Sequence, residues 1–145
     1  MREIKFRGKR VDNGEWTYGY YFKTFEIDIE RNEPYELHYI VIGRDYVQVV
    51  PESVGQFIGL IDKHKISIYE GDIVEMTDTT GAGRTLAIVK WINEYSCFEL
   101  IKSDDADSLE KYNQSDYEVK GNIYENPKLM DESATYIGDP GWNRN

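Results

Sequence analysis

The chain has 145 residues, 40% of them hydrophobic and 14% aromatic, and its 17 basic and 27 acidic side chains give a formal net charge of -10. This composition excludes a disordered protein and indicates one domain or two very small ones. The negative charge repels phosphate backbones and anionic membranes, so sequence-independent nucleic-acid binding is not expected. The 12 tyrosines favour β-strands over helices.

The single cysteine and the apolar runs bear on the cellular compartment. Cys97 can form no intrachain disulfide, which is typical of a reducing cytosol, and its place in the apolar run 95–101 predicts a small core side chain. The N-terminus lacks the apolar region of a secretory leader, and no run approaches the length of a membrane span. We therefore expect a soluble, cytoplasmic protein.

The N-terminal residues predict a β-hairpin. Residues 2–11 place Ile4 and Phe6 on one face and charged side chains on the other, with the period of two that a half-buried strand shows. Asn13-Gly14 then predicts a two-residue type I′ turn, because both central positions of that turn need positive φ. An aromatic strand follows over residues 16–23.

This hairpin combines basic and aromatic side chains, which resembles a stacking surface for single-stranded nucleic acid. The alternative is an edge strand that its Lys and Arg side chains protect from aggregation, and the net charge favours this alternative. Arg7 and Lys9 are kept as candidate binding residues. The residues concerned are Arg2, Lys5, Arg7, Lys9, Arg10, Trp16, Tyr18, Tyr20 and Tyr21.

More strands are predicted along the next part of the chain. Apolar and acidic residues alternate over 25–30, and residues 31–34 interrupt this pattern. Further strands are expected over 35–42 and 46–50. The segment Pro51-Glu52-Ser53 predicts a single helical turn, since proline is tolerated at the first helical position.

The stretch 54–74 is predicted to be the centre of the fold. Two strands flank the polar reversal Asp62–Lys65, and a turn or bulge is expected at Tyr69-Glu70-Gly71-Asp72, where glycine permits an unusual backbone conformation. Tyr69, expected to be exposed, and Asp72 are candidate binding residues.

The remaining strands are predicted over 86–92, 95–102 and 117–123, and their short, even spacing is typical of a small barrel or sandwich. Gly81-Ala82-Gly83 lacks the third glycine and the helix of a phosphate-binding loop, so we interpret it as a hairpin tip. Residues 103–115 predict a helix or a disordered insertion.

The residue types needed for catalysis or metal binding are few. His38 and His64 have no spacing to each other or to Cys97 that indicates a metal site or a nucleophile–base pair. Asp105 and Asp107 lack the glycine and glutamate of a calcium loop, which favours a solvated acidic loop. The sequence predicts no catalytic residue, metal or cofactor, and hence no enzyme.

Four segments together resemble the YopX family of phage and prophage proteins. They are MREIKFRGK, VGQFIGLIDK followed by IYEGDIV, AIVKW and EVKGNIYENPKLM, in the family's order from Met1 to Met130. The resemblance implies a mostly β protein with an SH3-like barrel in its C-terminal part, encoded by a bacteriophage or prophage and present in the cytoplasm of the bacterial host. The family has no established biochemical function.

The resemblance suggests an organisation and one local departure. We expect an N-terminal β region (1–55) packed on an SH3-like barrel (56–127), followed by a C-terminal arm (128–145), or all of these as one compact domain. His64-Lys65 stands where the family often has Asn-Gly, so this turn needs a different type or a costly positive φ.

Three functions remain open from the sequence. The first is a non-enzymatic module that binds a host or phage protein, because tyrosine is enriched at interfaces. The second is a self-assembling structural protein, in which the basic residues 2–10 of one copy contact the acidic residues 104–118 of another. The third is a nucleic-acid binder that uses the basic first strand. No membrane and no small-molecule substrate is implied.

Overall fold

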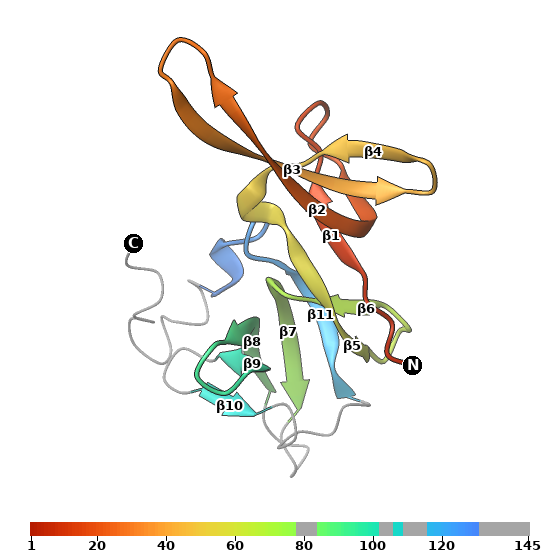
Figure 1. The fold of residues 1–145 in the computed structure, drawn as a ribbon. Helices are drawn as coiled ribbons and strands as arrows, with labels where there is room; N and C mark the ends of the chain where they lie inside the picture. The colour runs from red at the N-terminus through yellow and green to blue at the C-terminus, as the bar shows by residue number, and fades with distance from the viewer. Residues whose placement is uncertain (78–83, 102–105, 109–115, 131–145) are drawn as a thin grey trace. The chain divides into compact units, whose positions relative to one another are not determined.

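A computed structural model describes residues 1–77, 84–101, 106–108 and 116–130 (Figure 1). Nearly all of its regular elements are β-strands, which confirms the mainly β prediction. None of the helices among the described residues has the length and apolar composition needed to cross a membrane. The elements are β1 (Phe6–Lys9), β2 (Trp16–Asp28), β3 (Glu33–Ile42), β4 (Asp45–Gln48), η1 (Pro51–Ser53), β5 (Gly55–Ile61), β6 (Ser67–Tyr69), β7 (Asp72–Thr77), β8 (Arg84–Ile92), β9 (Cys97–Ile101), β10 (Ala106–Ser108) and β11 (Glu118–Asn122).

The strands form two antiparallel sheets, with the orders β4-β3-β2-β1-β5-β6 and β10-β9-β8-β7-β11. The chain divides into two units, Met1–Phe57 and Ile58–Asn145, so β5 begins in the first and ends in the second. Both strand orders are open. The closed SH3-like barrel is therefore not found among the described strands, where β10 and β11 remain at opposite edges of their sheet.

The N-terminal hairpin forms as predicted, but its turn differs. Lys9 pairs with Trp16, and the Arg10 N–H donates to the Glu15 carbonyl at 2.8 Å, which leaves a four-residue loop in place of the predicted two-residue turn. Gly14 has a positive φ of 72°, whereas Asn13 does not. The Asn13 side chain instead accepts the Glu15 N–H at 2.9 Å, so it closes the loop through its carbonyl oxygen.

The long ribbon of β2 and β3 is the other departure in the first unit. β2 is one continuous strand of 13 residues, where the sequence had suggested two, and it pairs with β3 from Tyr20↔Val41 to Asp28↔Glu33. Pro34, predicted to interrupt the strands, lies inside β3 opposite Ile27. The ribbon projects well past β1 and β4 in Figure 1. The helical turn predicted at residues 51–53 is confirmed as η1.

The core of the first unit lies on one face of its sheet. Ile40 and Val49 are buried there, and the rings of Phe6 and Tyr21 pack 5.5 Å apart. Ile4, predicted to share this face with Phe6, is half exposed because β1 begins only at Phe6.

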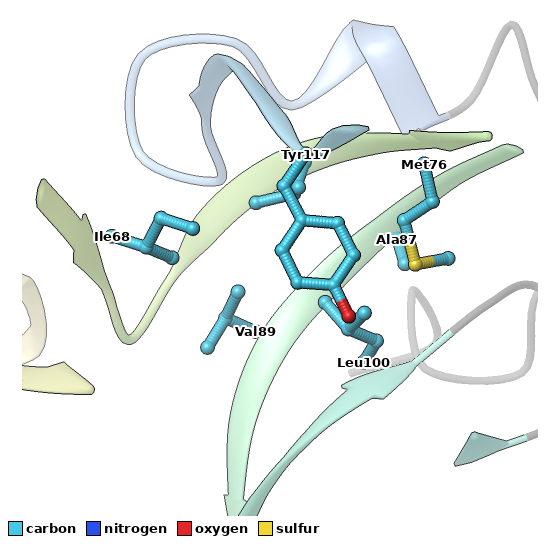
Figure 2. Packing of buried hydrophobic residues seen from close by; sticks show 7 residues of the cluster. Ile68, Met76, Ala87, Val89, Leu100 and Tyr117 are labelled. Carbon is cyan, nitrogen blue, oxygen red and sulfur yellow. The ribbon is translucent and has the colours of Figure 1, made fainter. Parts of the chain in front are cut away.

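The core of the second unit is shared between β5–β6 and the five-stranded sheet. Ile58, Leu60 and Ile68 come from the former, and they pack with buried residues of β7, β8 and β9. Figure 2 shows the Tyr117 ring among these side chains. Packing of the second-unit residues of β5–β6 against the five-stranded sheet therefore buries this core. Its buried residues are Ile68, Val74, Met76, Ala87, Val89, Leu100 and Tyr117.

The C-terminal half differs from the sequence predictions at residues 106–108 and at Cys97. Ala106–Ser108 is a strand paired with β9, so the helix suggested for this region is wrong there. The rest of 103–115 is outside the described residues. Gly81-Ala82-Gly83, predicted to be a hairpin tip, and residues 131–145 of the predicted C-terminal arm are also outside the described residues. Met130 is buried against Ile73 and Ile88. Cys97 is half-buried at the start of β9 rather than a core residue.

Gly19 is expected to be essential for the pairing of β2 with β3. A Cβ at this position would collide with the main-chain carbonyl of Val41, and such overpacking costs about 1–3 kcal/mol. We expect Gly19→Ala to lower the free energy of unfolding by this amount in urea titrations. Gly43→Asn is the control: Gly43 has a φ of +62° and open space around it, and asparagine tolerates that conformation. Equal losses in the two variants would contradict the prediction.

Candidate functional site

A cluster of aromatic side chains covers one face of the sheet in the first unit. The pairs Tyr20↔Val41, Phe22↔Tyr39 and Val41↔Tyr46 place alternate residues of β2, β3 and β4 on a common face. The Phe22 and Tyr39 rings stack 5.0 Å apart, and the Tyr46 ring packs edge-on against Tyr39 at 5.4 Å. We call this surface the tyrosine face; it consists of Tyr18, Tyr20, Phe22, Tyr39 and Tyr46.

The outer members of the tyrosine face are open to solvent. Tyr18, Tyr20 and Tyr46 are 47%, 69% and 63% exposed. A cleft of about 410 Å³ adjoins the face and is lined by residues 1–5, Gly19 and Tyr20. Tyrosine offers a rigid apolar body and a hydroxyl that donates and accepts, so this surface can contact a protein partner at little cost in side-chain entropy.

The basic side chains of β1 lie against aromatic rings. The Arg7 guanidinium is 4.4 Å from the Trp16 ring centre, and Lys9 Nζ is 5.8 Å from the same ring. Arg7 is only 6% exposed, which corrects the prediction that it points outward with Lys5 and Lys9. The Lys9 N–H also donates to Ser53 Oγ at 2.7 Å. These contacts occupy the ring face that a stacked base would need.

Tyr69 and Asp72 form the turn between β6 and β7. Both are buried, at 2% and 1% exposed, so the expectation of an exposed Tyr69 is wrong. The Asp72 carboxylate accepts the Tyr69 N–H at 2.8 Å, and Gly71 between them has a φ of +89°. The predicted glycine turn is therefore confirmed, and its two candidate residues are placed inside the fold.

Sequence reasoning did not single out Asp62, which organises the central reversal. Its Oδ1 accepts the N–H groups of His64 at 2.8 Å and Ile66 at 2.9 Å, and its Oδ2 accepts the Val119 N–H at 3.0 Å. Lys65 adopts the positive φ (+67°) that the sequence had indicated as costly. The bonds from His64 and Ile66, on either side of Lys65, to the Asp62 carboxylate hold the backbone in this conformation. An aspartate at the start of a turn is a sequence signal for the bonds within the reversal. No sequence signal indicates the bond from Val119, which is distant in the chain.

Glu118, beside Val119, links the reversal to β11 through charge. Its carboxylate lies 2.9 Å from Lys63 Nζ, 3.2 Å from Lys120 Nζ and 3.5 Å from His64 Nε2. Hydrogen bonds from Lys63 and Lys120 lower the pKa of Glu118 to about 2. The His64 side chain is exposed at this cluster.

His38 lies between a tyrosine and a glutamate. Tyr21 Oη is 2.6 Å from His38 Nδ1, and Glu36 Oε2 is 3.2 Å from His38 Nε2. Burial raises the pKa of Tyr21, so its hydroxyl stays protonated and is a poor nucleophile. Among the residues that the structure describes, no three His, Cys, Asp or Glu side chains are grouped to hold a metal ion.

The fold and these surfaces define a mainly β protein of two antiparallel sheets with an exposed aromatic face. The chain belongs to the YopX family: the family model described as YopX protein matches residues 5–131, which confirms the resemblance of the sequence motifs. Comparison with curated proteins gives no match.

The solved structures that are similar include the following two. YopX from Bacillus subtilis is 16% identical, with 90% of this chain and 97% of that chain covered and a TM-score of 0.51. Protein EF1440 from Enterococcus faecalis is 20% identical, with 90% and 99% covered and a TM-score of 0.49. At such identity the similarity to the Bacillus protein concerns the fold alone.

Asp62→Asn should destabilise the second unit, because an amide NH₂ in place of one carboxylate oxygen leaves at least one buried N–H facing a donor. We expect the free energy of unfolding to fall by about 1–3 kcal/mol, measured in urea. Asp12→Asn, on an exposed side chain paired with Arg10, is the control and should change stability little. An unaffected Asp62→Asn would show that the carboxylate does not hold the reversal.

Acid should destabilise the protein over a defined pH range. Burial tends to raise the pKa of Asp62, but its hydrogen bonds from Val119, Ile66 and His64 outweigh burial and lower it below the ordinary 3.8, and Glu118 falls from 4.5 to about 2. Lowered carboxyl pKa values stabilise the fold above the unfolded-state values, and that contribution is lost as pH falls through the folded-state values.

The urea midpoint should therefore stay level near neutral pH and fall from about pH 4.5 towards about pH 2. Glu118→Gln should flatten the acid limb, and added salt should weaken the contribution of Glu118 more than that of buried Asp62. A midpoint that is constant down to pH 2 would contradict this assignment.

Proposed function

We propose that this chain is an accessory protein of a bacteriophage or prophage that acts by binding another protein and not by catalysis. Membership of the YopX family supports the phage context. The observation that carries the binding role is the exposure of Tyr18, Tyr20 and Tyr46 on one sheet face.

An exposed cluster of this kind has the composition of a binding hot spot. Tyrosine is among the residues that dominate interface energies, and such residues act when neighbouring contacts exclude water from them. Phe22 and Tyr39 are half-buried, and the Tyr46 ring packs edge-on against both, at 5.9 Å from Phe22 and 5.4 Å from Tyr39. The Tyr46 ring is thus ordered before a partner binds, which lowers the entropic cost of binding.

Nucleic-acid binding receives less support. The faces of Trp16 and Phe57 are contacted by the cationic groups of Arg7, Lys9 and Lys5, and the chain carries a net charge of -10. Self-assembly remains an alternative that the proposed experiment distinguishes, because recovery of the tagged chain alone would favour it.

Affinity capture tests the proposal. The tagged full chain is exposed to bacterial lysate at moderate salt, with and without nuclease, and bound proteins are identified by mass spectrometry. We expect a stoichiometric partner that survives nuclease. In a Tyr20→Ala/Tyr46→Ala variant this partner should be lost, since truncation of a tyrosine in a hot spot costs more than about 1 kcal/mol.

Tyr95→Ala is the matched control. Tyr95 is 70% exposed, as Tyr20 is, but lies in the turn between β8 and β9 of the second unit. A partner that is retained by the double variant, or lost equally with Tyr95→Ala, would rule out the tyrosine face as its site. Thermal unfolding of each variant shows whether the fold is intact.

A further inference from the structure

We propose that the outer edge of β2, from Tyr21 to Ile27, binds an extended segment of the partner by adding a strand to the sheet, and that apolar and basic side chains alternate in this segment. The inference deepens the proposed function, on which it rests, by naming how the partner binds and what its segment contains.

The register shows where this edge begins. β1 pairs with β2 only from Lys9↔Trp16 to Phe6↔Gly19, whereas β2 continues to Asp28. Beyond Gly19, no strand among the described residues pairs with β2 on the side that β1 occupies. The apolar cleft lined by residues 1–5, Gly19 and Tyr20 adjoins the start of the edge.

Hydrogen bonding shows which main-chain groups face outward. The His38 carbonyl accepts the Val49 N–H at 2.9 Å, so the main-chain groups of His38 point away from β2. Because opposed residues of an antiparallel pair point either both inward or both outward, those of Lys23, opposite His38, point away from β3. Main-chain orientation repeats every second residue along a strand, so the N–H and C=O groups of Phe25 and Ile27 also point away from β3.

The opposite edge of the ribbon is less suited to strand addition. By the same alternation, Glu36 and Pro34 of β3 present their main-chain groups outward beyond the end of the β4 pairing. Pro34 has no N–H to donate, and proline is a residue that protects sheet edges. On β2 the corresponding positions are Phe25 and Ile27, which both have an N–H. Lys23 is the one charged residue among the outward-facing positions of this β2 edge. Its ammonium forms an ion pair with Glu36 at 3.2 Å, so its charge is partly neutralised.

The side chains beside this edge determine what the partner strand must contain. Phe25 and Ile27 are 65% and 66% exposed on one face of the ribbon, and an apolar side chain opposite them would bury both. Glu26 and Asp28 lie on the other face, with Glu33 opposite Asp28, and they favour Lys or Arg. A two-stranded ribbon is marginally stable in water, so a third strand also stabilises the ribbon itself.

A synthetic peptide tests the inference. The probe is a fluorescein-labelled peptide of about ten residues, the length of a long strand, that alternates valine and lysine. Its affinity for the full chain is measured by fluorescence anisotropy. Replacing its lysines with glutamates should weaken binding by at least about tenfold, since like charges would then face Glu26 and Asp28.

Two variants at one position separate main chain from side chain. Phe25→Val and Phe25→Pro both remove the ring, but only proline removes the outward N–H. We expect Phe25→Pro to weaken binding by at least about tenfold and Phe25→Val by about threefold or less. Amide exchange by NMR in the unmodified chain does not depend on either variant folding. Peptide binding should slow exchange more at Lys23, Phe25 and Ile27 than at Thr24 and Glu26, whose N–H groups already face β3.

Binding together with this alternating protection supports the inference. It is overturned by absent binding, by equal binding of the lysine and glutamate peptides, or by binding without that protection. Protection that grows with protein concentration alone would assign the edge to a second copy and also overturn it. A lysate partner lost with Tyr20→Ala/Tyr46→Ala but retained by Phe25→Pro would overturn the strand addition while leaving the proposed function intact.

Discussion

The register between β2 and β3 is the constraint on which the tyrosine face and the proposed binding edge of β2 depend. It begins at Tyr20↔Val41, directly after Gly19, where a side chain would collide with the Val41 carbonyl. A shift by one residue would exchange the two faces of β2. Tyr20 and Phe22 would then replace Tyr21 beside the core, and the tyrosine face would be lost. The same register sets which amides of β2 point outward.

A buried carboxylate has a comparable role in the second unit. Asp62 accepts three main-chain N–H groups, two from its own turn and one from Val119, 57 residues further along. A buried charge is stable only when it is hydrogen-bonded, so the turn and β11 stabilise each other. The second unit thus joins its central reversal to its last strand through hydrogen bonds and the ion pairs of Glu118 as well as through the shared apolar core.

The two units differ in how they treat aromatic side chains. In the second unit Tyr69 and Tyr117 are buried. In the first, Ile40 and Val49 are buried, whereas Tyr18, Tyr20 and Tyr46 of the tyrosine face are exposed. A phenolic hydroxyl keeps such a face compatible with water while the ring remains available to a partner. This difference, more than the overall number of tyrosines, supports the tyrosine face as the proposed binding surface.

Local patterns in the sequence determined much of the fold. Alternation of apolar and polar residues located nearly every strand, Asn13-Gly14 marked the first hairpin, and Pro51 marked the helical turn, because each depends on residues close in the chain. The family motifs added the fold relationship. Tertiary structure alone decided what depends on distant partners: the burial of Arg7 and Tyr69, the bond from Val119 to Asp62, and the open sheets in place of a closed barrel. Likewise, the alternation of Tyr18, Tyr20 and Phe22 was visible in the sequence, but their grouping with Tyr39 and Tyr46 required the pairing of three strands, which no local pattern specifies.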